Sequence, residues 1–387
     1  IGAAVVFAAW WFVDPSRAFS ATLAVLVVTC PCALSLATPA AIAAATSALA
    51  RRGVLVAHSD ALETLAKANH VLWDKTGTLT KGLIRVEEVR VLSDVPEAEC
   101  LSLALALERM SEHPIARAFL ASGTGSAAAR DVEVVAGQGL EGTVGERRLR
   151  IGHPAFAASL APSLAVPNGL DGLDGESWVG LGDARGLLAA FRLTDQLRPE
   201  AGECVARLRV LGLDSEIVSG DEDAAVARIA ARSRIERHQS RLSPEAKLER
   251  LKALQAGGAV VVAIGDGIND APLLRGADVA IAMGRGSALA QTSADLILVR
   301  DSLDALPETV QLARRTQRIV RQNLAWSIIY NIAALPLAAF GLVPPWLAAI
   351  GMSLSSVAVV LNAMRLSRGT ETGSGGGWSL QRPAEAA

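Results

Sequence analysis

Two long stretches without a charged side chain, one toward each end of the chain, constrain its fold most strongly. Ser20–Ala50 and Gln322–Met364 contain no Asp, Glu, Lys or Arg. Because a helix rises about 1.5 Å per residue, the first stretch is more than long enough for the roughly 30 Å hydrocarbon core of a bilayer. The second has Pro344-Pro345 in its middle and predicts two spans joined by a tight turn. Ile1–Val13 is apolar but too short to span and lacks the basic start of a signal peptide, so we expect the chain to begin partway through a transmembrane helix.

Arginines beside the apolar stretches predict their orientation. The connections Asp14–Phe19 and Gly341–Pro345 hold one basic residue between them, Arg17. The opposite ends of the stretches are flanked by eight arginines: Arg51, Arg52, Arg314, Arg315, Arg318, Arg321, Arg365 and Arg368. Because cytoplasmic loops are enriched in Lys and Arg, the chain from about 51 to 321 is predicted to be cytoplasmic. We therefore expect an integral, multi-pass membrane protein, in contact with the lipid bilayer, with the chain between the apolar stretches in the cytoplasm.

The cytoplasmic block alternates between strand-like apolar runs and helical stretches rich in Ala, Leu, Arg and Glu. The strand-like runs are Val71–Trp73, Glu216–Val218, Val260–Gly265, Val279–Ala282 and Leu296–Val299. Such alternation predicts a parallel, doubly wound α/β sheet. Three of the runs lead to an aspartate, Asp74, Asp221 or Asp266, and reactive groups in such sheets lie at the carboxyl ends of the strands. Three carboxylates at one edge predict a site for Mg²⁺ and phosphate.

Composition bears on two other classes of protein. The formal net charge is −2, which gives no reason to expect nucleic acid as a partner. Four cysteines in 387 residues are not a disulfide framework. Two of them, Cys30 and Cys32, flank Pro31 inside the first apolar stretch. Thiolates are soft ligands that favour Cu(I) or Zn(II), so this position suggests a metal pathway.

The run Asp74-Lys75-Thr76-Gly77-Thr78-Leu79-Thr80 resembles the phosphorylation motif of the P-type ATPases, ion pumps that pass through an aspartyl phosphate. The resemblance implies that ATP and Mg²⁺ are required and that Asp74 accepts the phosphoryl group. It also implies that Asp74, Asp266 and the backbone carbonyl of Thr76 hold the Mg²⁺. Three further catalytic positions follow from the match: Lys247, which neutralises the phosphoryl group, Asp270 beside the Mg²⁺ ligand, and Ser219, in a Ser-Gly-Asp run where the family usually has Thr-Gly-Asp. Asp195 and Pro199 match another signature of the phosphorylation domain.

Residues 83–192 separate the phosphorylation motif from the rest of its sheet and are numerous enough for a domain. The segment resembles the nucleotide-binding domain of heavy-metal P-type ATPases. The resemblance implies that five residues surround adenosine: Glu108, His113, Gly137, Gly139 and Gly152. We therefore expect a haloacid-dehalogenase-like, doubly wound phosphorylation domain with an inserted α+β nucleotide-binding domain, together with α-helical transmembrane segments.

Three sets of residues in the apolar stretches resemble the copper(I) subgroup of heavy-metal pumps. The implied copper ligands are Cys30, Cys32, Tyr330, Asn331, Met352 and Ser356. The implied function is ATP-driven export of Cu(I), with a cytosolic copper chaperone as a further partner. One alternative is a zinc or cadmium pump, although those carry a charged Lys and Asp in these spans. The other is a haloacid-dehalogenase-like phosphatase, which usually carries a second Asp where this chain has Thr76.

The resemblance also places domain boundaries. We expect membrane segments and a cytoplasmic extension in 1–66, the phosphorylation domain in 67–82 and 193–315, the nucleotide-binding domain in 83–192, two membrane helices in 316–366 and a disordered tail in 367–387. The actuator domain, with its Thr-Gly-Glu loop, and the earlier transmembrane helices have no counterpart in this sequence. We therefore expect that this chain by itself does not complete a transport cycle.

Overall fold

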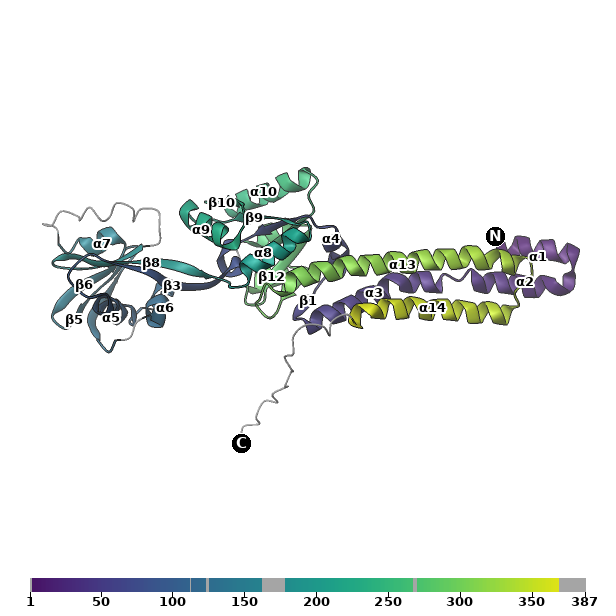
Figure 1. Ribbon diagram of the computed structural model, residues 1–387, viewed down its shortest axis with the longest axis horizontal. Helices are drawn as coiled ribbons and strands as arrows, with labels where there is room; N and C mark the ends of the chain where they lie inside the picture. Colours follow the sequence, from purple (N-terminus) through teal and green to yellow (C-terminus); the bar gives the residue numbers. More distant parts are fainter. Residues whose placement is uncertain (1, 112, 123–124, 162–177, 267–269, 369–387) are drawn as a thin grey trace, which may run out of the picture. The chain divides into compact units, whose positions relative to one another are not determined.

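The computed structural model describes residues 2–111, 113–122, 125–161, 178–266 and 270–368 (Figure 1). Contacts within the chain divide it into two compact units. The helical unit comprises residues 1–67, 295–300 and 305–387, and the α/β unit comprises residues 68–294 and 301–304. The tail that the sequence predicts to be disordered lies outside the described residues from 369 onward.

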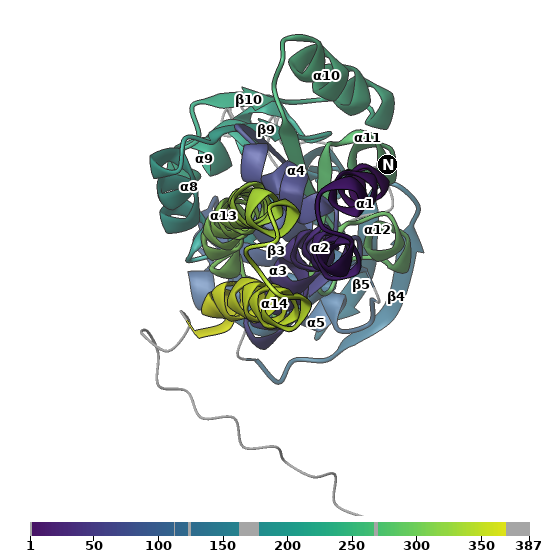
Figure 2. The ribbon, with the colours of Figure 1, turned by 90° about the vertical axis from the view of Figure 1, so that its right-hand side faces the viewer.

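Long apolar helices build the helical unit. Its elements are α1 (Gly2–Val13), α2 (Pro15–Val28), α3 (Cys32–Arg51), β1 (Val54–Val56), α4 (Ala61–Lys67), β13 (Leu296–Leu298), α13 (Ala305–Ala339) and α14 (Pro345–Arg368). Seen end on, α2, α13 and α14 lie side by side (Figure 2). The turn expected at Pro344-Pro345 is confirmed, because α13 ends just before it and α14 begins at its second proline.

Small side chains let these helices pack closely. One side of α3 carries buried alanines and packs against α13 and α14. The buried alanines are Ala33, Ala37, Ala41, Ala45 and Ala48. Small residues allow backbones to approach, which matters in lipid because burial of apolar surface gives little driving force there. A polar contact joins the same bundle, since Asn362 Nδ2 donates to Asn323 Oδ1 at 2.8 Å between α14 and α13.

The first predicted span is interrupted and not a continuous kinked helix. α2 ends at Val28 and α3 begins at Cys32, and the cap residue Pro31 has non-helical angles of φ −81° and ψ 33°. Proline cannot donate a backbone hydrogen bond and its ring clashes with the preceding turn, so the helix stops there. The loop expected at Asp14–Phe19 is also absent. Asp14 caps α2 by accepting a hydrogen bond from the Ser16 N–H, so the helix starts at Pro15.

Two helical stretches are long and apolar enough to cross a membrane, Pro15–Arg51 and Pro345–Ser367. The span expected in the first part of Gln322–Met364 lies in α13, but that helix is not among those that meet this criterion in the described chain. Gln322, Asn323 and Asn331 lower its mean hydropathy. Large apolar side chains of α13 and α14 are nevertheless exposed, for example Ile329, Ile332 and Leu354. Contiguous exposed apolar surface of this kind fits contact with lipid.

A parallel sheet with the strand order β12-β11-β2-β9-β10 forms the first half of the α/β unit. Its strands are β2 (His70–Trp73), β9 (Asp214–Val218), β10 (Arg237–Gln239), β11 (Val261–Gly265) and β12 (Val279–Met283). The helices in the connections are α8 (Ala201–Val210), α9 (Asp223–Ser233), α10 (Pro244–Ala256), α11 (Ala271–Gly276) and α12 (Ala288–Thr292). The predicted α/β class is therefore confirmed.

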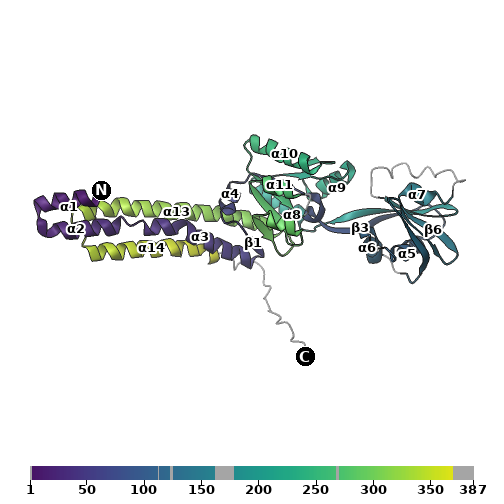
Figure 3. The same cartoon turned by 180° about the vertical axis from the view of Figure 1, so that it is seen from behind.

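A six-stranded antiparallel sheet, in the order β3-β8-β7-β6-β5-β4, forms the second half. Its elements are β3 (Thr80–Val91), α5 (Glu97–Glu108), α6 (Pro114–Ser122), β4 (Ala129–Val135), β5 (Gly139–Val144), β6 (Arg147–Gly152), α7 (Pro154–Ala158), β7 (Trp178–Asp183) and β8 (Gly186–Leu197). Helices α5 and α6 cover one face and α7 the other (Figures 1 and 3). Side chains alternate accordingly, because Leu181 of β7 joins the core under α5 while Gly180 and Gly182 lie against α7.

Two long strands connect the phosphorylation motif with this second sheet. β3 begins at Thr80, immediately after the motif, and pairs along its length with β8, from Thr80 opposite Leu197 to Val91 opposite Ala189. Both strands cross the domain boundaries expected at 82/83 and 192/193. The inserted domain is therefore joined to the parallel sheet through a continuous two-stranded ribbon.

Candidate active site

The carboxyl ends of β2 and β11 bring aspartates together. The two strands pair in parallel, and Asp74 and Asp266 each follow the last residue of their strand. The Asp74 N–H donates to Ile264 O at 2.9 Å, which extends the pairing to Asp74 itself. Asp270 lies at the start of α11. Carboxylate oxygens of Asp74, Asp266 and Asp270 all lie within 4.8 Å of one another. The strand ends correctly predicted Asp74 and Asp266, but the third carboxylate of this group is Asp270 and not Asp221, which forms an ion pair with Lys75.

Lys247 joins two of these carboxylates. Lys247 lies in the first turn of α10. The start of this helix is stabilised by the Ser243 hydroxyl, which accepts a hydrogen bond from the Ala246 N–H, and by Pro244 at the first helical position. The Lys247 Nζ donates to Asp74 Oδ1 at 2.5 Å and to Asp270 Oδ1 at 2.8 Å. All three side chains are buried. A buried cation needs such partners, because an unpaired charge away from water costs several kcal/mol.

The buried carboxylates are crowded. The pKa of Asp74 is raised to about 7, chiefly by burial and then by the charge of Asp270, while Lys247 opposes both effects. The pKa of Asp266 is raised to about 6, chiefly by burial and then by the charges of Asp270 and Asp195. For Lys247, burial lowers the pKa, but Asp74 and Asp270 outweigh it and the net shift is upward. The cluster thus has more negative charge than one lysine balances, and it would be stabilised by a further cation.

An open pocket of about 330 Å³ gives access to the cluster. Its walls include the sequence-predicted residues Thr76 and Ser219, and Asp221 at its rim is half exposed. The Ser219 hydroxyl accepts from the Asp221 N–H at 3.2 Å, and Lys75 forms an ion pair with Asp221. Lys75 had no assigned role in the sequence analysis. Because Lys75 follows Asp74 directly, this pair fixes one side of the phosphorylation loop.

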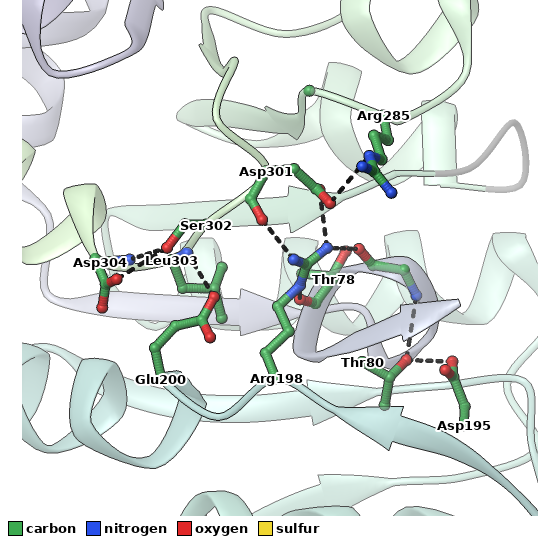
Figure 4. Close-up of polar contacts among 12 residues, drawn as sticks. Thr78, Thr80, Asp195, Arg198, Glu200, Arg285, Asp301, Ser302, Leu303 and Asp304 are labelled. Carbon is green, nitrogen blue, oxygen red and sulfur yellow. Dashed lines mark hydrogen bonds and ion pairs between the residues drawn. The ribbon is translucent and has the colours of Figure 1, made fainter. Parts of the chain in front are cut away.

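The loop after Asp74 is held by residues from β8 and the chain beyond it (Figure 4). The Thr80 hydroxyl accepts from the Gly77 N–H at 3.2 Å and has Lys75 O and the Asp195 carboxylate as acceptors for its single proton. The buried guanidinium of Arg198 donates to the Gly77 and Thr78 carbonyls. Sequence reasoning noted Asp195 but missed Arg198, although both belong to the same run before Pro199.

The donor set fits Mg²⁺. This ion prefers carboxylate and carbonyl oxygens at about 2.1 Å in an octahedron, so its ligand oxygens lie about 3 to 4 Å apart. The oxygens of Asp74, Asp266 and Asp270 lie within 4.8 Å of one another, a limit slightly wider than this spacing. The raised pKa values of Asp74 and Asp266 show the electrostatic strain that an ion would relieve.

The predicted adenosine-binding residues lie around α5 and the β5–β6 pair. Glu108 is the last residue of α5 and is buried, and burial raises its pKa to about 7. His113 is exposed, and its Nδ1 accepts from the Ile115 N–H at 3.3 Å. Gly137 lies in the turn before β5 at φ +71°, with open space where a β-carbon would be.

Gly139 and Gly152 have a packing reason to be glycine. They pair across β5 and β6. A β-carbon on Gly139 would lie 2.7 Å from the Cα of Gly152, and one on Gly152 would lie 2.6 Å from the Cα of Gly139. Both also have positive φ, near +150°. The close approach of two backbones therefore accounts for these glycines, and their assignment to the nucleotide site remains a prediction.

Within the helical unit, a small cavity brings together most of the predicted copper ligands. Its walls include Cys30 at the break between α2 and α3, Tyr330 and Asn331 of α13, and Met352 of α14. Its volume of about 10 Å³ has room for a single water or ion.

The cavity differs from the predicted ligand set at two positions. Cys32 and Ser356 are not among its lining residues, and Ser355 is. The Ser356 hydroxyl instead donates to Met352 O at 3.1 Å, while the Ser355 hydroxyl accepts from Trp326 Nε1 at 3.2 Å. The structure also joins Cys30 and Cys32 as a disulfide. Binding of a metal through both sulfurs therefore requires the reduced form.

Comparison with known proteins agrees with this arrangement. The family of haloacid dehalogenase-like hydrolases matches residues 68–278. A cation-transporting P-type ATPase B of Mycobacterium tuberculosis is 40% identical over 358 residues, which cover 90% of this chain and 48% of that protein. A copper-exporting P-type ATPase of the same organism is 38% identical over 371 residues, covering 94% of this chain and 48% of that protein. The chain spans about half the length of the curated relatives it matches.

Solved structures show the same relationship. The crystal structure of a zinc-transporting PIB-type ATPase in the E2.Pi state is 32% identical, with a TM-score of 0.85, over 95% of this chain and 61% of that one. A catalytic domain of a CPx-ATPase, studied for its conformational changes upon nucleotide binding, is 26% identical with a TM-score of 0.56, over 68% of this chain and 98% of that one.

Proposed function

Because this chain belongs to the haloacid dehalogenase-like hydrolases, and its relatives along most of its length are heavy-metal P-type ATPases, we propose that it acts in ATP-driven export of Cu(I) through an aspartyl phosphate at Asp74. One observation supports the catalytic part most strongly. Lys247 bridges Asp74 and Asp270 at the floor of an open pocket, with Asp266 beside them.

The proposed step is transfer of a phosphoryl group. A carboxylate oxygen of Asp74 bonds to the γ-phosphorus of ATP as the bond to the β–γ bridging oxygen breaks, and ADP leaves with that oxygen. Lys247 offsets the negative charge that would otherwise repel the phosphoryl group from Asp74. Asp270 keeps the lysine in place from its other side. A nucleophilic Asp74 must be ionised, which Lys247 favours against the effect of burial.

Asp74, Asp266 and the Thr76 carbonyl would hold Mg²⁺ in this proposal. When bound, the ion supplies positive charge that orients the phosphate and stabilises the charge of the transferring group. Ser219 lines the same pocket and has a hydroxyl available for the phosphoryl oxygens. Glu108, His113, Gly137, Gly139 and Gly152 are proposed to hold adenosine, on the resemblance described above.

Cu(I) is the proposed substrate of the membrane part. The cavity lined by Cys30, Met352, Tyr330 and Asn331 offers two soft sulfur atoms and no carboxylate. Soft sulfur ligands favour a monovalent soft ion, whereas Zn(II) in a dry site would call for further nitrogen or oxygen ligands. Zn(II) remains the second candidate, because the zinc-transporting ATPase structure matches nearly the whole chain. Export and delivery by a cytosolic chaperone belong to the proposal as well.

A hydrolase that only removes phosphate is the less favoured candidate. Phosphatases of this superfamily usually carry a second aspartate two positions after the nucleophile, as a general acid and base. Here that position is Thr76, whose hydroxyl does not ionise near neutral pH and so cannot replace the aspartate as a general acid and base. The aspartyl phosphate is therefore expected to be long-lived, which suits a pump.

Labelling with ATP tests the proposal. The purified chain is incubated with Mg²⁺ and ATP labelled in the γ-phosphate, and acid-stable, hydroxylamine-sensitive protein label is counted. We expect label in the wild type, none in Asp74→Asn, and undiminished label in Asp94→Asn, because Asp94 is an exposed residue outside the site. Equal labelling of the Asp74 variant would refute the assignment.

A further inference from the structure

Arg198 is a buried cation whose contacts go to the loop after Asp74 and to Asp301 (Figure 4). It lies just after β8 and is 3% exposed. Its Nε donates to Thr78 O at 2.7 Å and its Nη2 to Gly77 O at 2.9 Å. These two carbonyls belong to the irregular turn after Asp74, η1 (Lys75–Leu79), where no strand neighbour is available to them. Buried carbonyls need donors, and the planar guanidinium supplies two at the correct spacing.

The same guanidinium also holds a second segment. Its Nη1 donates to Asp301 O at 2.6 Å, and its Nη2 donates to Asp301 Oδ1 at 2.9 Å. Two residues along, the Glu200 carboxylate accepts from the Leu303 N–H at 3.3 Å. Arg198 and Glu200, which lie two residues apart, therefore hold residues 301–304 together. In sequence this segment leads directly into α13, which begins at Ala305.

The loop that Arg198 holds abuts the Asp266 carboxylate. A β-carbon on Gly77 would coincide with that carboxylate, so the backbone of Gly77 packs directly against it. Displacing the Gly77 carbonyl would therefore move a neighbour of the proposed Mg²⁺ ligand. Arg198 contacts the loop through the Gly77 and Thr78 carbonyls and segment 301–304 through Asp301.

We propose that Arg198 is a positioning residue that couples the phosphorylation loop to segment 301–304, so that binding of Mg²⁺ and phosphate at the loop is transmitted to the chain entering α13. The proposal rests on the proposed function of Asp74. Arg198 itself does not touch the reacting atoms. It acts through the Gly77 carbonyl on one side and Asp301 on the other.

Variants at both ends of the contact separate coupling from simple stability. Arg198→Lys keeps the charge but loses the two-pronged donor geometry. Asp301→Ala removes one of the four contacts, whereas Asp301→Asn keeps an oxygen acceptor in the same place. Asn also tolerates the positive φ of +52° at this position, so it is the conservative rescue. Arg285→Gln is the control, because Arg285 reaches the same carboxylate only at 3.6 Å and its side chain is 83% exposed.

The first readout is the Mg²⁺ dependence of labelling by ATP. Loss of a residue that orients a metal ligand typically costs about 10-fold or more in metal affinity. We expect Arg198→Lys to raise the half-saturating Mg²⁺ concentration about 10-fold while retaining label at saturation. Arg285→Gln should match the wild type. If the wild type itself takes no label, the proposed function fails before this inference is reached.

The second readout is hydrogen exchange, which does not depend on activity. Peptides covering 75–80 and 301–304 are followed with and without Mg²⁺ and beryllium fluoride as a phosphate analogue. In the wild type and in Asp301→Asn we expect added protection in both peptides; in Arg198→Lys and Asp301→Ala we expect it only in 75–80. The proposal is overturned if Mg²⁺ and beryllium fluoride still slow hydrogen exchange in peptide 301–304 of Arg198→Lys and the half-saturating Mg²⁺ concentration of this variant equals that of the wild type. Should Arg198→Lys fail to fold, the same result in Asp301→Ala overturns it.

Discussion

A β-carbon on Gly77 would occupy the space of the Asp266 carboxylate. Gly77 lies three residues after Asp74 and has φ of +71°, a conformation that favours glycine. Its missing side chain lets the loop after β2 close over the aspartate that follows β11. The glycine of the phosphorylation motif is therefore explained by the packing of one strand end against another.

Replacing Gly77 by alanine should abolish labelling by ATP. The added methyl group would push Asp266 away from Asp74 and disturb the proposed Mg²⁺ site. Gly82→Ala is a matched control, because Gly82 also has positive φ, +65°, but a β-carbon there would meet nothing closer than 3.8 Å. Backbone strain of about 1 to 2 kcal/mol is common to both variants. Equal labelling of the two would show that the contact with Asp266 has no catalytic importance.

Replacing Lys247 by methionine should reduce labelling by at least about 100-fold, because removing one preorganised charge at a reacting oxyanion typically costs that much. Methionine replaces the lysine stem with a neutral side chain one atom shorter, and leaves Asp74 and Asp270 without their ion-pair partner. Lys252→Met on the exposed side of the same helix is the control. The initial rate of labelling at saturating ATP is the measurement. A rate within twofold of the wild type would exclude charge compensation by Lys247.

The burial of the Glu108 carboxyl group predicts that the free energy of unfolding depends on pH. Burial raises its pKa from 4.5 to about 7, so the folded chain holds this proton more tightly than the unfolded chain. Its contribution to stability is fully present below about pH 4.5 and is lost as the pH rises through about 7. Glu108→Gln should therefore be several degrees more stable than the wild type at about pH 8, and should lose this advantage at about pH 5.

Thermal unfolding at the two pH values tests this expectation. The control is Glu97→Gln, in the exposed first turn of the same helix. A Glu108→Gln variant that follows the wild type at both pH values would show that the carboxyl group is ionised in the folded chain.

Metal selectivity separates the two candidate pumps. The purified chain, reduced so that Cys30 and Cys32 are thiols, should bind Cu(I) in competition with a chromophoric chelator. We expect Cys30→Ser to lower this affinity at least about 10-fold and Met352→Ala to lower it less, because a thiolate is the stronger ligand for a soft ion. Cys204→Ala removes a buried thiol of the α/β unit and is the control. Tight binding of Zn(II) with weak binding of Cu(I) would favour the zinc candidate.

The parallel sheet could be predicted because its strands are short apolar runs that end at polar turns. Val71–Trp73 and Val261–Gly265 are buried along their length, so their sequences have the continuous apolar pattern of central parallel strands. β10 was missed because its residues, Arg237-His238-Gln239, are polar and it lies at the edge of the sheet. Nothing in a local pattern distinguishes such a strand from a loop.

The site was predictable only where strand ends define it. The positions of Asp74 and Asp266 follow from their strands, but the role of Arg198 depends on Asp301, about a hundred residues later, and no periodicity links them. The difference between Ser355 and Ser356 has another cause. Spacing along a helix gives the residues that share a face, yet the orientation of that face toward α3 and α13 depends on packing.

The central claim, that Asp74 carries the phosphoryl group, is tested most directly by trapping the intermediate. Borohydride reduces an acyl phosphate to an alcohol, so a phosphorylated aspartate becomes homoserine and is located by mass spectrometry of the digested chain. After incubation with ATP and Mg²⁺, we predict homoserine at position 74 and at no other aspartate. Homoserine at Asp266 or Asp270, or hydroxylamine-sensitive label with an intact Asp74, would contradict the account.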